Sequence, residues 1–257
     1  MKIVSVAIQK GGAGKTTTTI NLAAALRDSG KKCLLVDLDP QASLSHSLGI
    51  SDELEPNIYH LLKRESAGDP APPEDAIVER YGMNVLSSSL ELAGAELELV
   101  SVYGREQILS QILDRLDKKY DYVLLDCPPS IGMLTVNALV ASHYLLMPVQ
   151  AEYLSLKGAK SFLRHLQLVK RLNAGLEVLG FVFTRFDARK TMTGEVEACL
   201  KDDFGDEMVF EARIRNNIAL AKAQQAGMDI YSFQKSSNGA ADYYEVGQEF
   251  LRRVSEK

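Results

Sequence analysis

The amino-acid sequence predicts an α/β fold, in which a single doubly wound, mostly parallel sheet with helices on both faces spans residues 1–257. Three observations support this prediction. Short apolar runs typical of buried strands alternate with segments whose apolar residues recur at helical spacing. A glycine-rich loop separates the first strand-like run from the first helix-like segment. No repeat, composition shift or flexible linker divides the chain, so we expect one domain.

The predicted strands are apolar runs rich in β-branched residues, leucine and aromatic residues. They cover residues 3–8, 32–37, 84–87, 120–126, 144–149, 178–184 and 208–210. The predicted helices carry apolar side chains at intervals of three and four residues, such as Ile108, Ile112 and Leu116. They cover residues 18–26, 57–62, 90–100, 105–116, 155–172, 191–204, 218–226 and 239–254.

The composition is that of an ordinary globular protein, with 46% apolar and 25% charged residues. No apolar run approaches the roughly 20 residues of a membrane-spanning helix, and no signal peptide precedes the first strand. Cys33, Cys127 and Cys199 form neither a disulfide framework nor a C-x-x-C pair, so we expect a cytoplasmic location. The net charge is −5, so any contact with nucleic acid requires a local basic patch.

The glycine-rich loop covers residues 9–17 and reads Gln-Lys-Gly-Gly-Ala-Gly-Lys-Thr-Thr. A loop of this kind between a strand and a helix turns its N–H groups inward and forms an anion site at the helix N-terminus. Lys15 can reach the β- and γ-phosphates of a nucleotide, and the Thr16 hydroxyl can bind Mg²⁺. The expected nucleotide-binding residues are Lys10, Gly11, Gly12, Ala13, Gly14, Lys15, Thr16 and Thr17.

Acidic residues follow two of the predicted strands. Asp37 and Asp39 come at the end of strand 32–37, and Asp126 ends strand 120–126. Because ligands of open α/β sheets lie beyond the carboxyl ends of the strands, we expect these acids to face the phosphates and the metal ion. Pro128 and Pro129 then force an irregular loop suited to sensing the γ-phosphate.

The glycine-rich loop departs from the usual G-x-x-x-x-G-K-[ST] pattern, because Gln9 replaces the first glycine and Lys10 precedes the double glycine. The form K-G-G-x-G-K-T-T resembles the deviant Walker A motif of the ParA/MinD group of P-loop NTPases. Three further motifs add to this similarity: V-D-L-D-P-Q at 36–41, L-L-D-C-P-P-S at 124–130 and F-D-A-R at 186–189. Together with residues 236–243, these motifs make the chain similar to the ParA/Soj ATPases over nearly its whole length.

The resemblance implies that the chain binds ATP and Mg²⁺ and forms a face-to-face homodimer with the nucleotides between the subunits. Lys10 would reach the phosphates bound to the other subunit, and Lys15 those of its own. Asp39 would position the attacking water, which makes Lys10, Lys15 and Asp39 the expected catalytic residues. The expected metal-site residues are Thr16 as a ligand, with Asp37 and Asp126 in the outer shell.

The resemblance also implies that the ATP-bound dimer binds double-stranded DNA without sequence preference and so associates with the nucleoid. A ParB-like or other cargo adaptor would stimulate hydrolysis, and the cycle would segregate or position a chromosome, plasmid or other cargo. Ala219 stands where many members have an arginine, and Lys222 where they have a glutamate. The candidate DNA-binding residues are Arg185, Arg189, Lys190, Arg213, Arg215 and Lys222.

Other readings of the sequence are possible. A MinD-like membrane-cycling ATPase would need a detachable amphipathic C-terminal tail. Residues 250–254 instead continue the core stripe of the last predicted helix, so we expect no stable membrane association. A GTPase could use residues 184–187 in place of an N-K-x-D motif, but the Asn and Lys are missing. A scaffold without catalysis would require a vestigial loop, yet Lys10, Lys15 and Asp126 are all present.

Overall fold

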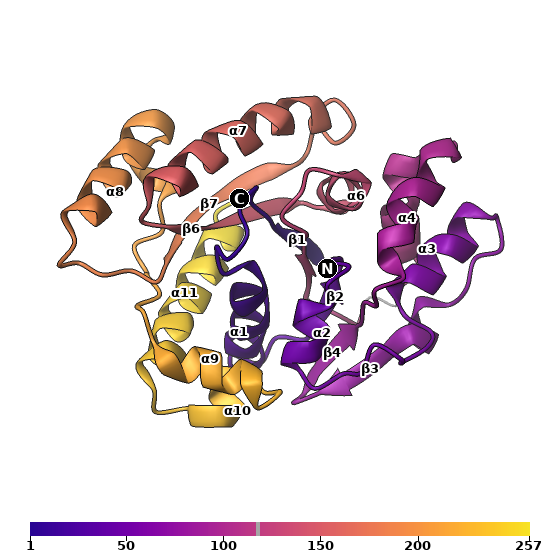
Figure 1. Cartoon of the computed structure of the whole chain (residues 1–257), viewed down its shortest axis with the longest axis horizontal. Helices are drawn as coiled ribbons and strands as arrows, with labels where there is room; N and C mark the ends of the chain where they lie inside the picture. Colours follow the sequence, from indigo (N-terminus) through magenta and orange to yellow (C-terminus); the bar gives the residue numbers. More distant parts are fainter. Residues whose placement is uncertain (117–118) are drawn as a thin grey trace.

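The structure is a computed structural model that describes residues 1–116 and 119–257. Its seven-stranded sheet has the order β3-β4-β2-β5-β1-β6-β7 (Figure 1). All neighbouring strands are parallel except β3 and β4. The strands are β1 (Lys2–Val6), β2 (Cys33–Asp37), β3 (Ile77–Arg80), β4 (Met83–Leu86), β5 (Tyr122–Asp126), β6 (Tyr144–Gln150) and β7 (Glu177–Thr184).

Helices cover both faces of the sheet, which confirms the predicted fold class. In the described part of the chain, no helix has the length and apolar character needed to cross a membrane. The helices are α1 (Lys15–Asp28), α2 (Ser43–Ser47), α3 (Ile58–Ser66), α4 (Leu92–Glu98), α5 (Ile108–Asp114), α6 (Met133–Ala141), α7 (Tyr153–Val169), α8 (Thr191–Phe204), α9 (Ile218–Gln225), α10 (Ile230–Gln234) and α11 (Asn238–Ser255).

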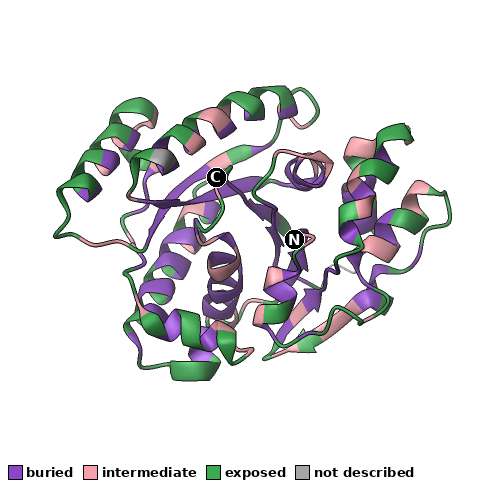
Figure 2. Cartoon of the chain, viewed as in Figure 1, coloured by how far each residue is buried: buried purple, intermediate pink, exposed green. Residues whose placement is uncertain are grey.

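The sheet separates two apolar cores. Alternate residues of β5 illustrate this arrangement, because Val123 and Leu125 belong to one core and Leu124 to the other. The first core lies under α3 to α8, and the second lies under α1, α2 and α9 to α11. Figure 2 shows the buried residues following the strands through the middle of the molecule. Because both faces are covered, the central strands read as continuous apolar runs in the sequence.

One predicted strand is wrong. Residues 206–208 form a 3₁₀ turn (Asp206–Met208), and Val209 pairs with β7 through a single bridge to Phe181. The Arg253 guanidinium donates to the Val209 carbonyl oxygen (2.9 Å), so a side chain takes the place of a strand partner. The apolar pattern of residues 208–210 instead reflects the complete burial of Phe210.

Several short elements were not predicted, for physical reasons that differ. The edge strand β3 is only half-buried and lacks the strong apolar signal of the central strands. Helix α6 is apolar on nearly all sides, so no helical period shows in its sequence. Helices α2 and α10 are five residues long. Pro73–Ala76 is a further 3₁₀ segment, and the predicted helices 90–100 and 105–116 include 3₁₀ turns at Leu99–Ser101 and Arg105–Gln107.

Candidate active site

The glycine-rich loop joins β1 to α1, and two of its glycines have left-handed backbone angles. Gly12 has φ 72°, and Gly14, the N-cap of α1, has φ 91° and ψ 22°. Residues with a Cβ rarely adopt these angles. The loop thus uses glycine where its backbone must turn toward the N-terminus of α1, the positive end of the helix dipole. This geometry provides an anion site.

Two side chains from β6 and β7 hold the loop in place. The Thr184 hydroxyl donates to the Ala13 carbonyl oxygen (2.8 Å), and the Gln150 amide donates to the Gly12 carbonyl oxygen (2.6 Å). A Cβ on Gly14 would lie 3.3 Å from Thr184 Cγ2, so the packing there is tight. The sequence predictions did not include Gln150 or Thr184. Their position at the carboxyl ends of two parallel strands is the signal that could have identified them.

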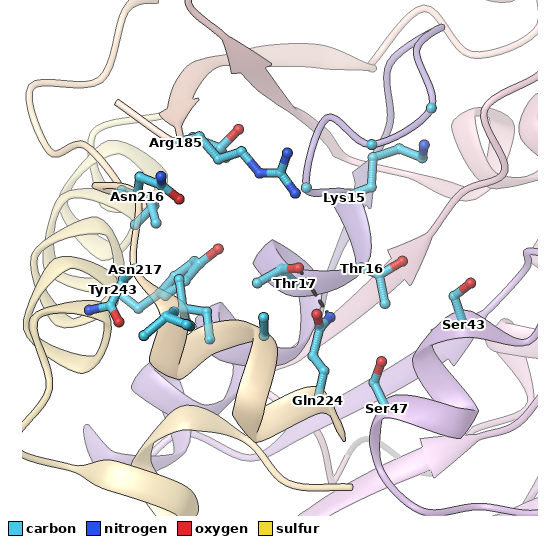
Figure 3. A pocket seen from close by; sticks show the side chains of 18 of the residues that line it. Lys15, Thr16, Thr17, Ser43, Ser47, Arg185, Asn216, Asn217, Gln224 and Tyr243 are labelled. Carbon is cyan, nitrogen blue, oxygen red and sulfur yellow. Dashed lines mark hydrogen bonds between the residues drawn. The ribbon is translucent and has the colours of Figure 1, made fainter. Parts of the chain in front are cut away.

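A cleft of about 1090 Å³ opens beside the loop. Most of the predicted nucleotide-binding residues line it, together with Asp39: Gly11, Gly12, Gly14, Lys15, Thr16 and Thr17. Ala13, also in the loop, is fully buried and does not line the cleft. Its opposite walls come from α2 and from the segment leading into α9 (Figure 3). The Gln224 amide of α9 donates to the Thr17 hydroxyl of α1 (3.1 Å), joining α9 to the helix that follows the glycine-rich loop. Lining residues that the sequence predictions missed include Ser43, Ser47, Asn216, Asn217, Gln224 and Tyr243.

Two buried carboxylates lie behind Thr16. Asp37 and Asp126 are register partners at the ends of β2 and β5, and both are fully buried. Asp126 accepts hydrogen bonds from the hydroxyls of Thr16 (2.6 Å) and Thr19 (3.3 Å). Asp37 accepts from the Ser45 N–H (2.9 Å) and hydroxyl (2.8 Å) and from the backbone N–H of residue 39 (3.2 Å). The structure therefore places Asp37 behind the cleft wall, with partners on both of its oxygens.

The surroundings of these carboxylates favour a cation. Burial raises the pKa of Asp126, and the neighbouring Asp37 raises it further. Burial also raises the pKa of Asp37, although the hydrogen bonds from Ser45 oppose this shift. A divalent cation near Thr16 would offset the repulsion between the two negative charges. Hydroxyl and carboxylate oxygens are the donors that Mg²⁺ prefers, so these residues fit a magnesium site.

The two loop lysines have different surroundings. Lys15 is 7% exposed, and its ammonium group lies 3.4 Å from the Lys10 carbonyl oxygen, within the turn of the loop. The Lys10 ammonium points to the start of α7, where it donates to Glu152 (2.6 Å) and to the Ser155 hydroxyl (2.8 Å). Lys10 also lies 3.4 Å from Gln150 Oε1. The sequence reasoning included both lysines but missed the partners of Lys10.

The six candidate DNA-binding residues have different surroundings. Three arginines pair with carboxylates: Arg189 with Asp187 (2.9 Å), Arg213 with Glu197 (2.6 Å) and Arg215 with Asp242 (2.6 Å). Arg185 lines the nucleotide cleft (Figure 3). The exposed side chains of Lys190 and Lys222 form no hydrogen bond or ion pair with the described residues.

Comparisons with known proteins agree with this geometry. A family model described as an AAA domain matches residues 1–178. The sporulation initiation inhibitor protein Soj of Bacillus subtilis is 39% identical over 252 residues, which cover 96% of this chain and 97% of that protein. The chromosome-partitioning ATPase Soj of Thermus thermophilus is 41% identical over 254 residues, covering 98% and 96% of the two chains.

A solved structure extends the comparison to a bound nucleotide. It is cobyrinic acid a,c-diamide synthase from Mycobacterium smegmatis with bound ADP and magnesium, which has a TM-score of 0.85 and 36% identity. The match covers 99% of this chain and 96% of that one. Sequence and fold therefore agree along nearly the full length of the chain. Because it matches the AAA-domain family model and is 39% and 41% identical in sequence to two Soj proteins, the chain belongs to the ParA/Soj family of P-loop ATPases.

Proposed function

We propose that the chain binds Mg·ATP in the cleft, closes into a homodimer around the nucleotides and hydrolyses ATP. Residues 10–17 hold the phosphates, and the Thr16 hydroxyl binds the ion. Asp126 accepts from Thr16 and, with Asp37, belongs to the outer shell of the ion. Bound ATP supplies a γ-phosphoryl group for transfer to water. The ADP and magnesium in a structure 36% identical to this chain support the choice of cofactors.

The observation that carries the proposal is the separation of the two loop lysines. Lys15 is buried against the loop, where it can neutralise the phosphates bound by its own subunit. Lys10 points out of the loop, and its ion-pair partner Glu152 has a side chain that is 60% exposed. Solvent screens the ion pair at its Glu152 end, so releasing Lys10, whose side chain is 18% exposed, requires mainly breaking its hydrogen bond to the Ser155 hydroxyl (2.8 Å). We infer that Lys10 leaves Glu152 when a second subunit presents its nucleotide.

Dimerisation is testable by light scattering with a slowly hydrolysed ATP analogue. The wild type should double in mass with ATP analogue and Mg²⁺, whereas Lys10→Ala should stay monomeric. Lys257→Ala is the matched control, because Lys257 also pairs with an exposed carboxylate, that of Glu177 (3.0 Å) at the amino end of β7. A wild type that stays monomeric at every concentration would contradict the proposed dimer.

Asp39 is the residue that we assign to the attacking water. It lies at the rim of the cleft, partly exposed, and several hydrogen bonds hold its turn. Its N–H donates to Asp37, its carboxylate accepts from the Gln41 N–H (3.0 Å), and its carbonyl accepts from the Ser88 hydroxyl (2.9 Å). A carboxylate held in this way can orient a water molecule without being a ligand of the metal ion.

We further propose that the ATP-bound dimer binds DNA without sequence preference, and so associates with the nucleoid. A ParB-like or other adaptor would stimulate hydrolysis and couple the cycle to a cargo such as a chromosome or plasmid. Two relatives support this role, the sporulation initiation inhibitor protein Soj and the chromosome-partitioning ATPase Soj. Because Arg189, Arg213 and Arg215 have carboxylate partners, we assign the main phosphate contacts to Lys190 and Lys222.

Two alternative functions have less support. A membrane-cycling role needs an apolar helix face available to lipid, but α11 buries Tyr243, Phe250 and Val254 in the core. A GTPase would use Asp187 to read guanine, but Asp187 pairs with Arg189 and does not line the cleft. Binding of ATP in preference to GTP, measured by calorimetry, would distinguish these nucleotides.

A further inference from the structure

Three potential metal-ligating side chains meet away from the nucleotide cleft. Carboxylate oxygens of Glu55 and Glu91 and a ring nitrogen of His60 all lie within 4.8 Å of one another. Glu55 precedes α3, His60 lies in the first turns of α3, and Glu91 is the residue before α4. Figure 1 shows these two helices side by side. Over residues 1–116 and 119–257, this is the one such group of His, Cys, Asp or Glu residues.

A buried amide determines which nitrogen of His60 faces the carboxylates. The Asn57 side chain is fully buried; its Nδ2 donates to the Leu54 carbonyl oxygen (3.2 Å), and its Oδ1 accepts from the Tyr59 N–H (3.0 Å). Since Oδ1 is an acceptor, His60 Nδ1, 3.1 Å away, must be the donor. The neutral ring then carries its lone pair on Nε2, 3.7 Å from a carboxylate oxygen of Glu55.

This arrangement brings three electron-pair donors together. Lys63, one turn further along α3, donates to the Tyr59 hydroxyl (3.4 Å) and forms no ion pair with Glu55 or Glu91. A backbone or amide oxygen that fixes the second nitrogen of a histidine is typical of metal-binding imidazoles. An imidazole with two carboxylates suits Zn²⁺ better than Mg²⁺ or Ca²⁺, which prefer oxygen ligands alone.

We propose that Glu55, His60 Nε2 and Glu91 form a zinc site that is separate from the nucleotide site. Ligand atoms of a tetrahedral zinc ion lie roughly 3.3 Å apart at bond lengths of about 2 Å. The Glu55 side chain is 63% exposed and Glu91 is also exposed, so both can rotate to close the site around the ion. A water molecule completes the coordination.

The site links two segments that lie behind the cleft. The Ile58 N–H at the start of α3 donates to the Ser87 carbonyl oxygen (3.0 Å), and the neighbouring Ser88 hydroxyl donates to the Asp39 carbonyl oxygen (2.9 Å). Zinc would therefore join the starts of α3 and α4 next to the segment that supports Asp39. Because the ion binds the folded state, it should also raise the thermal midpoint of unfolding.

The test uses the full chain without nucleotide, in excess Mg²⁺ to occupy the cleft, and with Cys199→Ser to remove an exposed thiol that could bind zinc by itself. Zn²⁺ is titrated against a chromophoric chelator. We expect one equivalent to bind, and His60→Gln and Glu91→Gln each to weaken binding about tenfold or more. His165→Gln is the control, because His165 hydrogen-bonds the Ser161 carbonyl oxygen (2.9 Å), is not a member of the proposed site, and should leave zinc affinity unchanged.

Co²⁺ gives a second readout that does not depend on stability. Its visible absorption should appear with the parent protein and with His165→Gln, and should be lost in His60→Gln. Circular dichroism of each variant checks that it is folded. Equal zinc affinity and identical cobalt spectra in the parent and His60→Gln would overturn the proposal, as would the absence of zinc binding by the folded parent.

Discussion

The glycine-rich loop allows a graded test, in which Gly11, Gly12 and Gly14 are each replaced by alanine. Gly11 is outside the left-handed region, and a Cβ there would meet no atom within 4 Å. Gly12 has φ +72° with open space around it. Gly14 has φ +91°, and its Cβ would lie 3.3 Å from Thr184 Cγ2. Alanine at Gly11 therefore tests the entropy of the unfolded chain alone, alanine at Gly12 adds backbone strain, and alanine at Gly14 adds both backbone strain and close packing.

The expected changes in the free energy of unfolding follow from these differences. At Gly11, alanine should stabilise the protein by about 0.4–1 kcal/mol, because it restricts only the unfolded chain. At Gly12, the same gain is offset by about 1–2 kcal/mol of left-handed strain. At Gly14, displacing Thr184 also weakens its hydrogen bond to the Ala13 carbonyl, worth about 1 kcal/mol, so we expect a net loss of about 2 kcal/mol.

Urea unfolding of the nucleotide-free protein measures these changes. Far-UV circular dichroism is the suitable signal, because the chain has no tryptophan. The midpoints should fall in the order Gly11→Ala, Gly12→Ala, Gly14→Ala, with unchanged slopes. If Gly14→Ala were as stable as Gly11→Ala, the left-handed geometry and the contact with Thr184 would both be refuted.

Three further predictions concern the site. Asp39→Ala should slow ATP hydrolysis roughly 100-fold or more while calorimetry shows unchanged ATP affinity; a parallel loss of affinity would contradict its role with water. Because burial raises the pKa of Asp126 above its ordinary value of 3.8, the wild type should lose stability as pH rises from 3.8 toward the folded-state pKa. Asp126→Asn should lose less over this range in urea titrations, and equal pH dependence would refute the assignment. Lys222→Glu should weaken binding of the ATP-bound protein to unrelated duplexes alike and lower the salt slope by about 1. In the same gel shifts Lys31→Glu, at the amino edge of the sheet, should have no effect, and equal losses in the two variants would contradict a specific patch.

The sequence alone was sufficient for the fold class and for the centre of the site. The strand, glycine-rich loop and helix around Lys15 are adjacent along the chain, so local pattern reveals them. Asp126 could be placed near Thr16 because the carboxyl ends of parallel strands meet at one edge of a sheet. The ParA/Soj resemblance rested on short motifs of the same local kind, and the comparisons confirmed it.

Only the tertiary structure decided which partners these residues have. Lys10 and Glu152 are 142 residues apart, and Thr184 is 171 residues from the carbonyl oxygen that it holds. The carboxylate partners of Arg213 and Arg215 likewise come from distant helices, α8 and α11, so the sequence did not reveal these ion pairs. Hydrogen bonds and ion pairs depend on distances of a few ångströms between distant segments, and chain packing, which local periodicity does not encode, sets those distances.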